Sequence, residues 1–184
     1  MTQGPSSRNE DKTTYKALKE TFGYTNTMQA PRLVKVVIST GTGKVKDKKK
    51  VELIQNRIAI ITGQKTAPRG AKKSIATFKV RQGDVVGYQV TLRGTRMYDF
   101  VDKLTHIALP RSRDFRGLKS SIIDDMGNMT IGLKEHTIFP ETSDENLSDV
   151  FGLAITLVST AKNKKEAEAF FRHIGIPLQE AAAE

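Results

Sequence analysis

Residues 86–93 alternate strictly between apolar and polar side chains, and this alternation constrains the fold more than any other feature of the chain. Successive side chains of a β-strand point to opposite faces of its sheet, so a period of two predicts a strand with one covered and one open face. The apolar set is Val86, Tyr88, Val90 and Leu92, and the other set is Gly87, Gln89, Thr91 and Arg93. In residues 33–39, likewise, the apolar side is Val34, Val36 and Ile38, and the polar side is Lys35 and Ser39. Such strands are typical of an antiparallel sheet.

Helical periodicity elsewhere supplies elements that can cover the apolar face. Apolar residues recur at spacings of three and four in residues 51–61, behind an N-cap at Asp47, and in residues 97–107, where Pro110 should end the helix. Residues 9–22 predict an N-terminal helix whose inward residues are Tyr15, Leu18 and Phe22.

A last helix is expected between a cap at Asn163 and the stop signal of Gly175 and Pro177, with Glu166 three residues after the cap. Residues 129–134 and 151–160 are further strand candidates. We therefore predict an α+β fold, in which amphipathic helices cover one face of an antiparallel sheet and the other face is open and polar.

The length and composition set further limits. With 184 residues, residues 1–184 fit a single domain, in which we expect 1–12 to be flexible, 13–180 folded and 181–184 frayed. The absence of cysteine excludes thiol nucleophiles, disulfides and Cys-based metal sites. No apolar run approaches the ~20 residues of a membrane span, and the polar N-terminus contains Glu10 and Asp11, unlike a secretory signal or an acid-poor transit peptide. We expect a cytoplasmic protein without a membrane partner and without homo-oligomers.

The charge is unevenly distributed. The net charge is +10, and residues 53–83 contain no acid but carry Arg57, Lys65, Arg69, Lys72, Lys73, Lys79 and Arg81. Two further basic clusters lie in residues 44–50 and 111–119, whereas 135–161 contains acids and neither Lys nor Arg. Three basic runs in one small domain favour a phosphate backbone as the partner. Because these runs lie mostly in loops, an anionic membrane is the weaker alternative. The open sheet face beside them could be simply solvated, or could rest on the minor groove of RNA.

No catalytic or cofactor site is predicted. Gly41-Thr42-Gly43-Lys44 follows a strand, but Ile38, Val45 and Lys46 break the Walker and dinucleotide patterns. The histidines, His106, His136 and His173, lie on separate segments, and His136 with Glu135 on a strand would point to opposite faces. The pair Asp124-Asp125 is more typical of a turn than of a Mg²⁺ site. We expect no enzyme, no metal and no cofactor.

Several stretches together resemble a known family. They are Ile61-Thr62-Gly63-Gln64-Lys65, Ala71-Lys72-Lys73-Ser74-Ile75-Ala76, Val90-Thr91-Leu92-Arg93-Gly94, Leu109-Pro110-Arg111-Ser112-Arg113-Asp114-Phe115-Arg116-Gly117-Leu118 and Phe139-Pro140-Glu141. This set strongly resembles ribosomal protein five of the bacterial large subunit, the family that carries 5S rRNA into the ribosome. The resemblance extends from about Tyr15 to Pro177.

The resemblance implies that the open sheet face and its adjoining turns lie on a 5S rRNA stem-loop, with 23S rRNA nearby. The expected rRNA-binding residues are Asn26, Gln29, Lys35, Ser39, Gly41, Gly43, Gln64, Lys65, Gln89, Thr91 and Arg93. The family usually has Asn at the position of Ser39, so this chain keeps a donor and an acceptor there but loses the reach of the amide.

The resemblance also implies two further contacts. A long basic hairpin over residues 71–81 would reach peptidyl-site tRNA through Lys72, Lys73, Ser74, Phe78, Lys79 and Arg81. The acidic residues Glu141, Asp144 and Glu145 would bridge to ribosomal protein thirteen of the small subunit, or would form an ordinary exposed acidic loop. The cluster of Arg111, Arg113 and Arg116 could bind RNA or a bridge partner, and Asp114 could instead pair with one of its arginines.

We therefore predict a structural, RNA-binding constituent of the large ribosomal subunit. The alternatives are an RNA-modifying enzyme and a free, non-ribosomal RNA-binding protein with the same basic surface.

Overall fold

The computed structural model describes residues 6–43, 45, 47–113, 115–142 and 149–179. The chain divides into two compact units. Unit 1 takes its residues from 1–36, 93–131 and 156–184, and unit 2 from 37–92 and 132–155.

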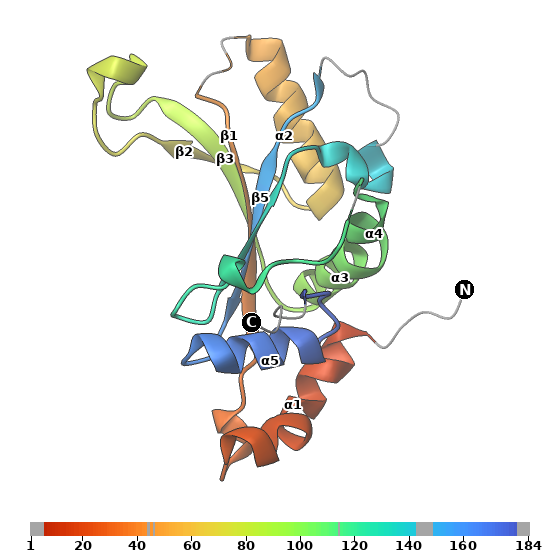
Figure 1. The fold of residues 1–184 in the computed structure, drawn as a ribbon. Coiled ribbons are helices and arrows are strands. Elements are labelled where there is room, and N and C mark those ends of the chain that lie inside the picture. The colour runs from red at the N-terminus through yellow and green to blue at the C-terminus, as the bar shows by residue number, and fades with distance from the viewer. Residues whose placement is uncertain (1–5, 44, 46, 114, 143–148, 180–184) are drawn as a thin grey trace. The chain divides into compact units, whose positions relative to one another are not determined.

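The strands form one five-stranded sheet, so the predicted α+β class is confirmed (Figure 1). The strands are β1 (Leu33–Gly41), β2 (Ala67–Gly70), β3 (Val85–Leu92), β4 (Met129–Leu133) and β5 (Leu153–Ser159). Their order is β2-β3-β1-β5-β4, and the sheet is antiparallel. Along β5 every second residue from Leu153 to Ser159 is buried, as expected of a sheet with one covered face.

In unit 2, helix α2 (Lys48–Thr62) packs against β3. Asp47 caps it as predicted, because its Oδ1 accepts a 2.9 Å hydrogen bond from Lys49 N. Ile54, Ile58 and Ile61 are buried, which confirms the inward face that their spacing predicted.

In unit 1, helices α1 (Ser7–Phe22), α3 (Thr95–Lys103) and α5 (Lys164–His173) surround a core that includes Met97, Phe100, Phe170 and Phe171. Helix α1 contacts both α3 and α5, and Figure 1 shows α1 and α5 side by side. Helix α1 begins within the segment that the sequence suggested to be flexible. Asp102 holds this end, since it accepts hydrogen bonds of 2.8 Å from Ser6 Oγ and from Ser7 N.

Two tyrosine hydroxyls tie the helices of unit 1 to carboxylates. Tyr24 donates a short hydrogen bond to Glu166, and Tyr98 donates one of 2.6 Å to Asp11. Burial, followed by these hydrogen bonds, raises the pKa of both tyrosines well above the ordinary value of 10.0.

The helix that Pro110 was expected to end continues past it. After α3 the chain forms a π-helical turn at Leu104–Ala108, then a short helix α4 (Leu109–Arg111). Leu109 N–H bonds to Leu104 O, the wider spacing of a π turn. Pro110 has no N–H to place in the ladder, and the widened turn just before it accommodates the ring.

Two further details differ from the sequence-based expectations. His136 lies in a short 3₁₀ turn (His136–Ile138) and not on a strand, and it is fully buried with its ring stacked on Phe151 at 4.0 Å. Asn163 occupies the cap position of α5 but its side chain makes no capping bond. Glu166 bonds instead to the segment before the helix, because its Oε2 accepts from Lys162 N at 2.7 Å.

Candidate nucleic-acid interface

The predicted alternation holds in the middle of β1 and at the end of β3. At the start of β3, Val86 and Tyr88 are half-buried like Gln89, and Gly87, which was predicted on the open face, is buried against β1. Val90 is 2% exposed and Leu92 is 1% exposed, whereas Gln89 and Thr91 are half-buried and Arg93 is exposed. On β1 the half-buried residues include Lys35 and Ser39. Val34 departs from the predicted pattern, since its side chain is exposed at the start of the strand. The hydrogen-bonding side chains therefore lie on the face opposite the core.

Sequence reasoning missed two polar pairs on the strands. Arg69 Nε donates a 2.6 Å hydrogen bond to Gln89 Oε1, so a residue of the predicted rRNA set is oriented by one that the sequence named only as part of a basic run. In unit 1, the hydroxyls of Thr130 and Thr156 lie 3.1 Å apart on β4 and β5. The alternation of residues 129–133 is the signal that could have placed Thr130 on an exposed face.

Three glycines of unit 2 differ in the space that the fold leaves for a side chain at their positions. A Cβ on Gly87 would lie 2.6 Å from Thr40 O. Strand β3 can therefore pack this closely beside β1 only because residue 87 has no side chain. Gly41 has open space where its Cβ would lie, and Gly43 would make only ordinary contacts with Val86, at 3.8 Å. The fold therefore leaves room at both positions for a group from outside the chain.

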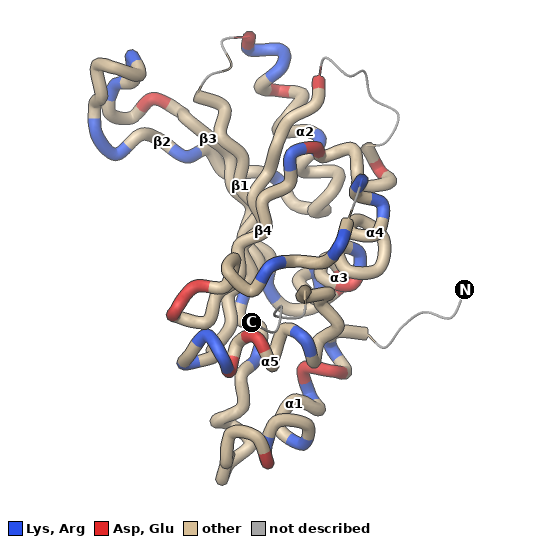
Figure 2. Tube along the Cα trace, viewed as in Figure 1, with Lys and Arg blue, Asp and Glu red and all other residues tan. Residues whose placement is uncertain are grey.

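The basic hairpin between β2 and β3 is an ordered arm (Figure 1). Ile75 and Val80 exchange backbone hydrogen bonds of 3.0 and 3.3 Å, and Ala71 exchanges bonds with Asp84 and Gly83. Ser74 Oγ accepts from Gln82 N at 2.9 Å, so this predicted tRNA-binding side chain already has a structural partner. The exposed cations of the arm are Lys72, Lys73, Lys79 and Arg81, and Figure 2 shows positive charge along the arm.

The arm is also apolar on one side. Phe78 is 70% exposed at its 3₁₀ turn (Ala76–Phe78), and Ile75 is 47% exposed. An open cleft of about 720 Å³ lies here and is bordered by Lys72 and Lys73. Its other lining residues include Ile75, Phe78, Val80, Val86, Gly41 and Gly43. Cations beside an exposed aromatic ring suit a ligand that has both phosphates and flat bases.

Asn26 and Gln29 form a reciprocal cap on the short helix Thr27–Gln29. Asn26 Oδ1 accepts from Met28 N at 3.0 Å, and Gln29 Oε1 accepts from Thr25 N at 2.9 Å. Both side-chain oxygens are therefore occupied within the loop. After α2, Gln64 is half-buried and Lys65 is exposed.

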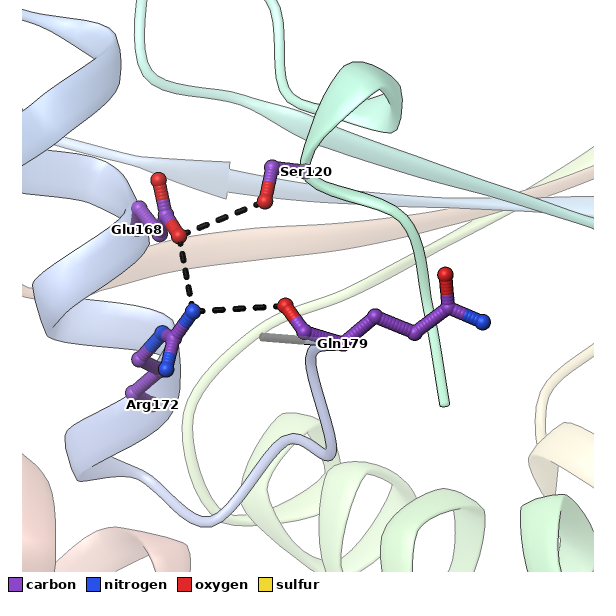
Figure 3. A network of polar contacts seen from close by, with 4 residues as sticks. All are labelled: Ser120, Glu168, Arg172 and Gln179. Atoms are coloured by element: carbon purple, nitrogen blue, oxygen red, sulfur yellow. Dashed lines mark hydrogen bonds and ion pairs between the residues drawn. The ribbon is translucent and has the colours of Figure 1, made fainter. Parts of the chain in front are cut away.

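The arginine cluster lies on a loop that is fastened to the C-terminal segment. Arg111, Arg113 and Arg116 are exposed, and Leu118 is bonded through its N–H to Pro177 O at 2.8 Å and through its O to Gln179 N at 2.8 Å. Side chains add to this attachment, as Figure 3 shows: Glu168 accepts from Ser120 Oγ at 3.2 Å and from Arg172 at 3.0 Å, and Arg172 also donates to Gln179 O. Hydrogen bonds to the C-terminal segment thus hold in place the loop that carries the exposed arginines.

Known proteins match the chain along most of its length. A family model described as Ribosomal protein L5 matches residues 26–81, and one described as ribosomal L5P family C-terminus matches residues 85–178. The chain is 45% identical over 171 residues to the large ribosomal subunit protein uL5 of Anaeromyxobacter sp. (strain K), covering 92% of this chain and 95% of that protein. It is 46% identical over 164 residues to uL5 of Flavobacterium johnsoniae, covering 89% and 90%. The chain belongs to the uL5 family of ribosomal proteins. A third relative, uL5 of Ruminiclostridium cellulolyticum, is 47% identical over 165 residues.

Membership of the uL5 family confirms several predictions made from the sequence. The family is one of structural proteins of the large ribosomal subunit and not of enzymes, and it implies a cytoplasmic, ribosomal location. Asp124 accepts hydrogen bonds from Asn128 at 2.6 and 3.0 Å, as turn chemistry predicts. No helix in the described part of the chain is long and apolar enough to cross a membrane.

Of the acidic residues expected at an intersubunit contact, Glu141 lies in unit 2. Glu141 is exposed in a 3₁₀ turn (Pro140–Thr142), whereas Asp144 and Glu145 lie outside the described residues. Thr142 fixes the end of this turn, because its buried hydroxyl donates to His136 O at 3.0 Å.

Proposed function

We propose that this uL5 family member binds 5S rRNA in the large subunit through the polar side of its sheet. The observation that carries the proposal is the half-buried or exposed state of Gln89, Thr91 and Arg93 beside the buried Val90 and Leu92. The expected contacts are the rRNA-binding residues named from the sequence, with Arg69 added because of its bond to Gln89. Side chains such as these can contact phosphates and 2′-hydroxyls of an RNA helix without reading its bases.

Unit 2 supports the second part of the proposal, a contact between the hairpin arm and peptidyl-site tRNA. Exposed lysines and arginine can neutralise phosphates of a tRNA whose sequence changes in each cycle, and Phe78 offers a stacking surface. Ser74 contributes by shaping the arm, through its bond to Gln82 N.

The third part is a bridge from Glu141, Asp144 and Glu145 to the basic ribosomal protein thirteen of the small subunit. Residues 135–161 contain acids but no Lys or Arg, so a basic partner meets no repulsion from cations of this segment. The exposed arginine cluster of unit 1 is the corresponding candidate for 23S rRNA or a bridge partner.

The test is binding of 5S rRNA at several salt concentrations by the wild type and by the double variant Thr91→Ala/Arg93→Ala. We expect folded variant protein with 5S rRNA affinity reduced by roughly tenfold or more, because two contacts on the exposed face are lost. The control is Lys16→Ala/Thr95→Ala, which removes the same charge and one hydroxyl from exposed helical positions. Unchanged affinity of the sheet variant, or a salt-independent affinity of the wild type, would contradict the proposal.

A further inference from the structure

A cleft of about 480 Å³ opens in unit 1 beside the arginine cluster. Its lining comes from three segments: Thr105 and His106 of the π turn, Pro110, Ser112 and Phe115 after it, and Pro177 near the C-terminus. The hydrogen bonds between Leu118 and the segment of Pro177 and Gln179 hold two of these segments together. Backbone hydrogen bonds therefore fix two of the three lining segments relative to each other.

Thr105 is a residue that the fold does not explain. The residue is buried, at 8% exposed, and its hydroxyl is the single buried side-chain oxygen or nitrogen without a hydrogen-bond partner in the described part of the chain. Buried polar groups of native proteins nearly always have a partner, so such a group suggests a missing ligand. Threonine in a helix uses two χ1 rotamers, so rotation about χ1 can exchange the positions of the hydroxyl and the methyl group of this cleft-lining residue.

The position of Thr105 in a π turn also indicates a ligand-binding site. π turns are rare, and they occur frequently at functional sites. Here the turn at Leu104–Ala108 brings Thr105 and His106 into the lining of one cleft, whereas the core of unit 1 needs only Leu104, Ala108 and Leu109 from this stretch.

The charges around the cleft are polarised. Arg111, Arg113 and Arg116 lie exposed on the loop that supplies Ser112 and Phe115. On another side Gly175 lines the cleft, and Glu10 Oε2 lies 3.6 Å from where a Cβ on this glycine would be. A ligand with an anionic end and a hydrogen-donating end matches this arrangement.

We propose that the cleft receives one unpaired nucleotide of ribosomal RNA. Its base lies against Phe115 and reaches the hydroxyl of Thr105, an exocyclic amino group faces Glu10, and its phosphate contacts the arginine cluster. A bare phosphate would leave the ring of Phe115 unused, and an apolar peptide side chain would use neither the arginines nor the hydroxyl. The inference rests on the proposed RNA-binding function and adds a base-specific contact to it.

The experiment is chemical probing of the bases in large subunits that contain either the wild-type full chain or a variant. Thr105→Val removes the hydroxyl at nearly constant shape, and Phe115→Leu removes the aromatic ring. We expect the same unpaired nucleotide to become roughly three- to tenfold more reactive with both variants, since each removes one contact to the base. The matched controls, Thr95→Val and Phe22→Leu, change an exposed threonine and a half-buried phenylalanine away from the cleft and should leave that nucleotide protected.

Stability separates this role from a structural one. Because the hydroxyl of Thr105 has no partner in the protein, Thr105→Val should leave the melting temperature of the isolated protein unchanged or raised. If both cleft variants enter the subunit normally and expose no common nucleotide, the inference is wrong. It is also wrong if the variants cause the loss of another subunit protein and leave the reactivity of the rRNA bases unchanged. A wild-type chain that fails to bind ribosomal RNA at all would overturn the proposed function itself.

Discussion

Arg69 Nε donates a 2.6 Å hydrogen bond to Gln89 Oε1 across the antiparallel pair of β2 and β3. Gln89 lies opposite Ala67 in the register, and Arg69 lies opposite Gly87, so the bond runs diagonally between the strands. It uses only one of the guanidinium nitrogens, and the two remaining nitrogens are of the kind that bind phosphate. The pair thus holds a cation beside the polar face of β3.

We predict that Arg69→Ala weakens 5S rRNA binding and lowers the slope of log affinity against log salt by about one, because one phosphate contact is lost. The free energy of unfolding should change by at most about 1 kcal/mol, since the bond to Gln89 is exposed. Filter binding over a range of KCl concentrations measures the slope, and urea unfolding measures stability. Lys16→Ala, which removes an exposed cation of α1, should leave the slope unchanged; equal slopes for all three proteins would exclude Arg69 from the interface.

Gly87→Ala should destabilise the protein by about 1–3 kcal/mol, because β1 and β3 must separate to admit a methyl group. The added Cβ would lie 2.6 Å from the backbone oxygen of Thr40. Gly132→Ala is the matched control, since no atom lies within 4 Å of its Cβ position, and it should change stability by less than about 0.5 kcal/mol. Chemical denaturation measures the free energy of unfolding of both variants. A Gly87 variant as stable as its control would show that β1 and β3 can move apart at little cost.

The sequence predicted the elements whose pattern comes from burial. The buried Val90 and Leu92 of β3 and the inward isoleucines of α2 followed from periodicity, because water and the core select opposite residue types. Pro110 misled the prediction, since a π turn depends on hydrogen-bond spacing that no residue type announces. Asn163 occupies the predicted cap position of α5, but only the fold decides whether a capping side chain forms its bond, and here it forms none. The bond between Arg69 and Gln89 depends on the register of two strands, which alternation alone does not give.

Phe78→Ala should weaken the binding of tRNA at the peptidyl site while leaving stability within about 0.5 kcal/mol of the wild type, because the ring is 70% exposed. If the ring stacks on a base, its loss should lower tRNA affinity by roughly tenfold. Met126→Ala, at an apolar side chain 74% exposed in a turn of unit 1, is the control for lost surface area. The measurement is tRNA retention by ribosomes that contain each variant, and equal retention by both would argue against a stacking role.

Alkaline pH should unfold the protein through Tyr24 and Tyr98. Burial, and then the hydrogen bonds to Glu166 and Asp11, raise the pKa of both hydroxyls above the ordinary value of 10.0, so the folded state holds these protons more tightly than the unfolded chain does. Their contribution is therefore complete below pH 10 and declines as the pH rises beyond it. Tyr24→Phe should cost about 2 kcal/mol at pH 7, since a buried carboxylate loses its donor, and should make the decline above pH 10 shallower. Urea unfolding between pH 7 and the alkaline limit tests both effects, with Tyr15→Phe as the matched hydroxyl deletion. A decline equally steep in wild type and Tyr24→Phe would place its cause in other groups.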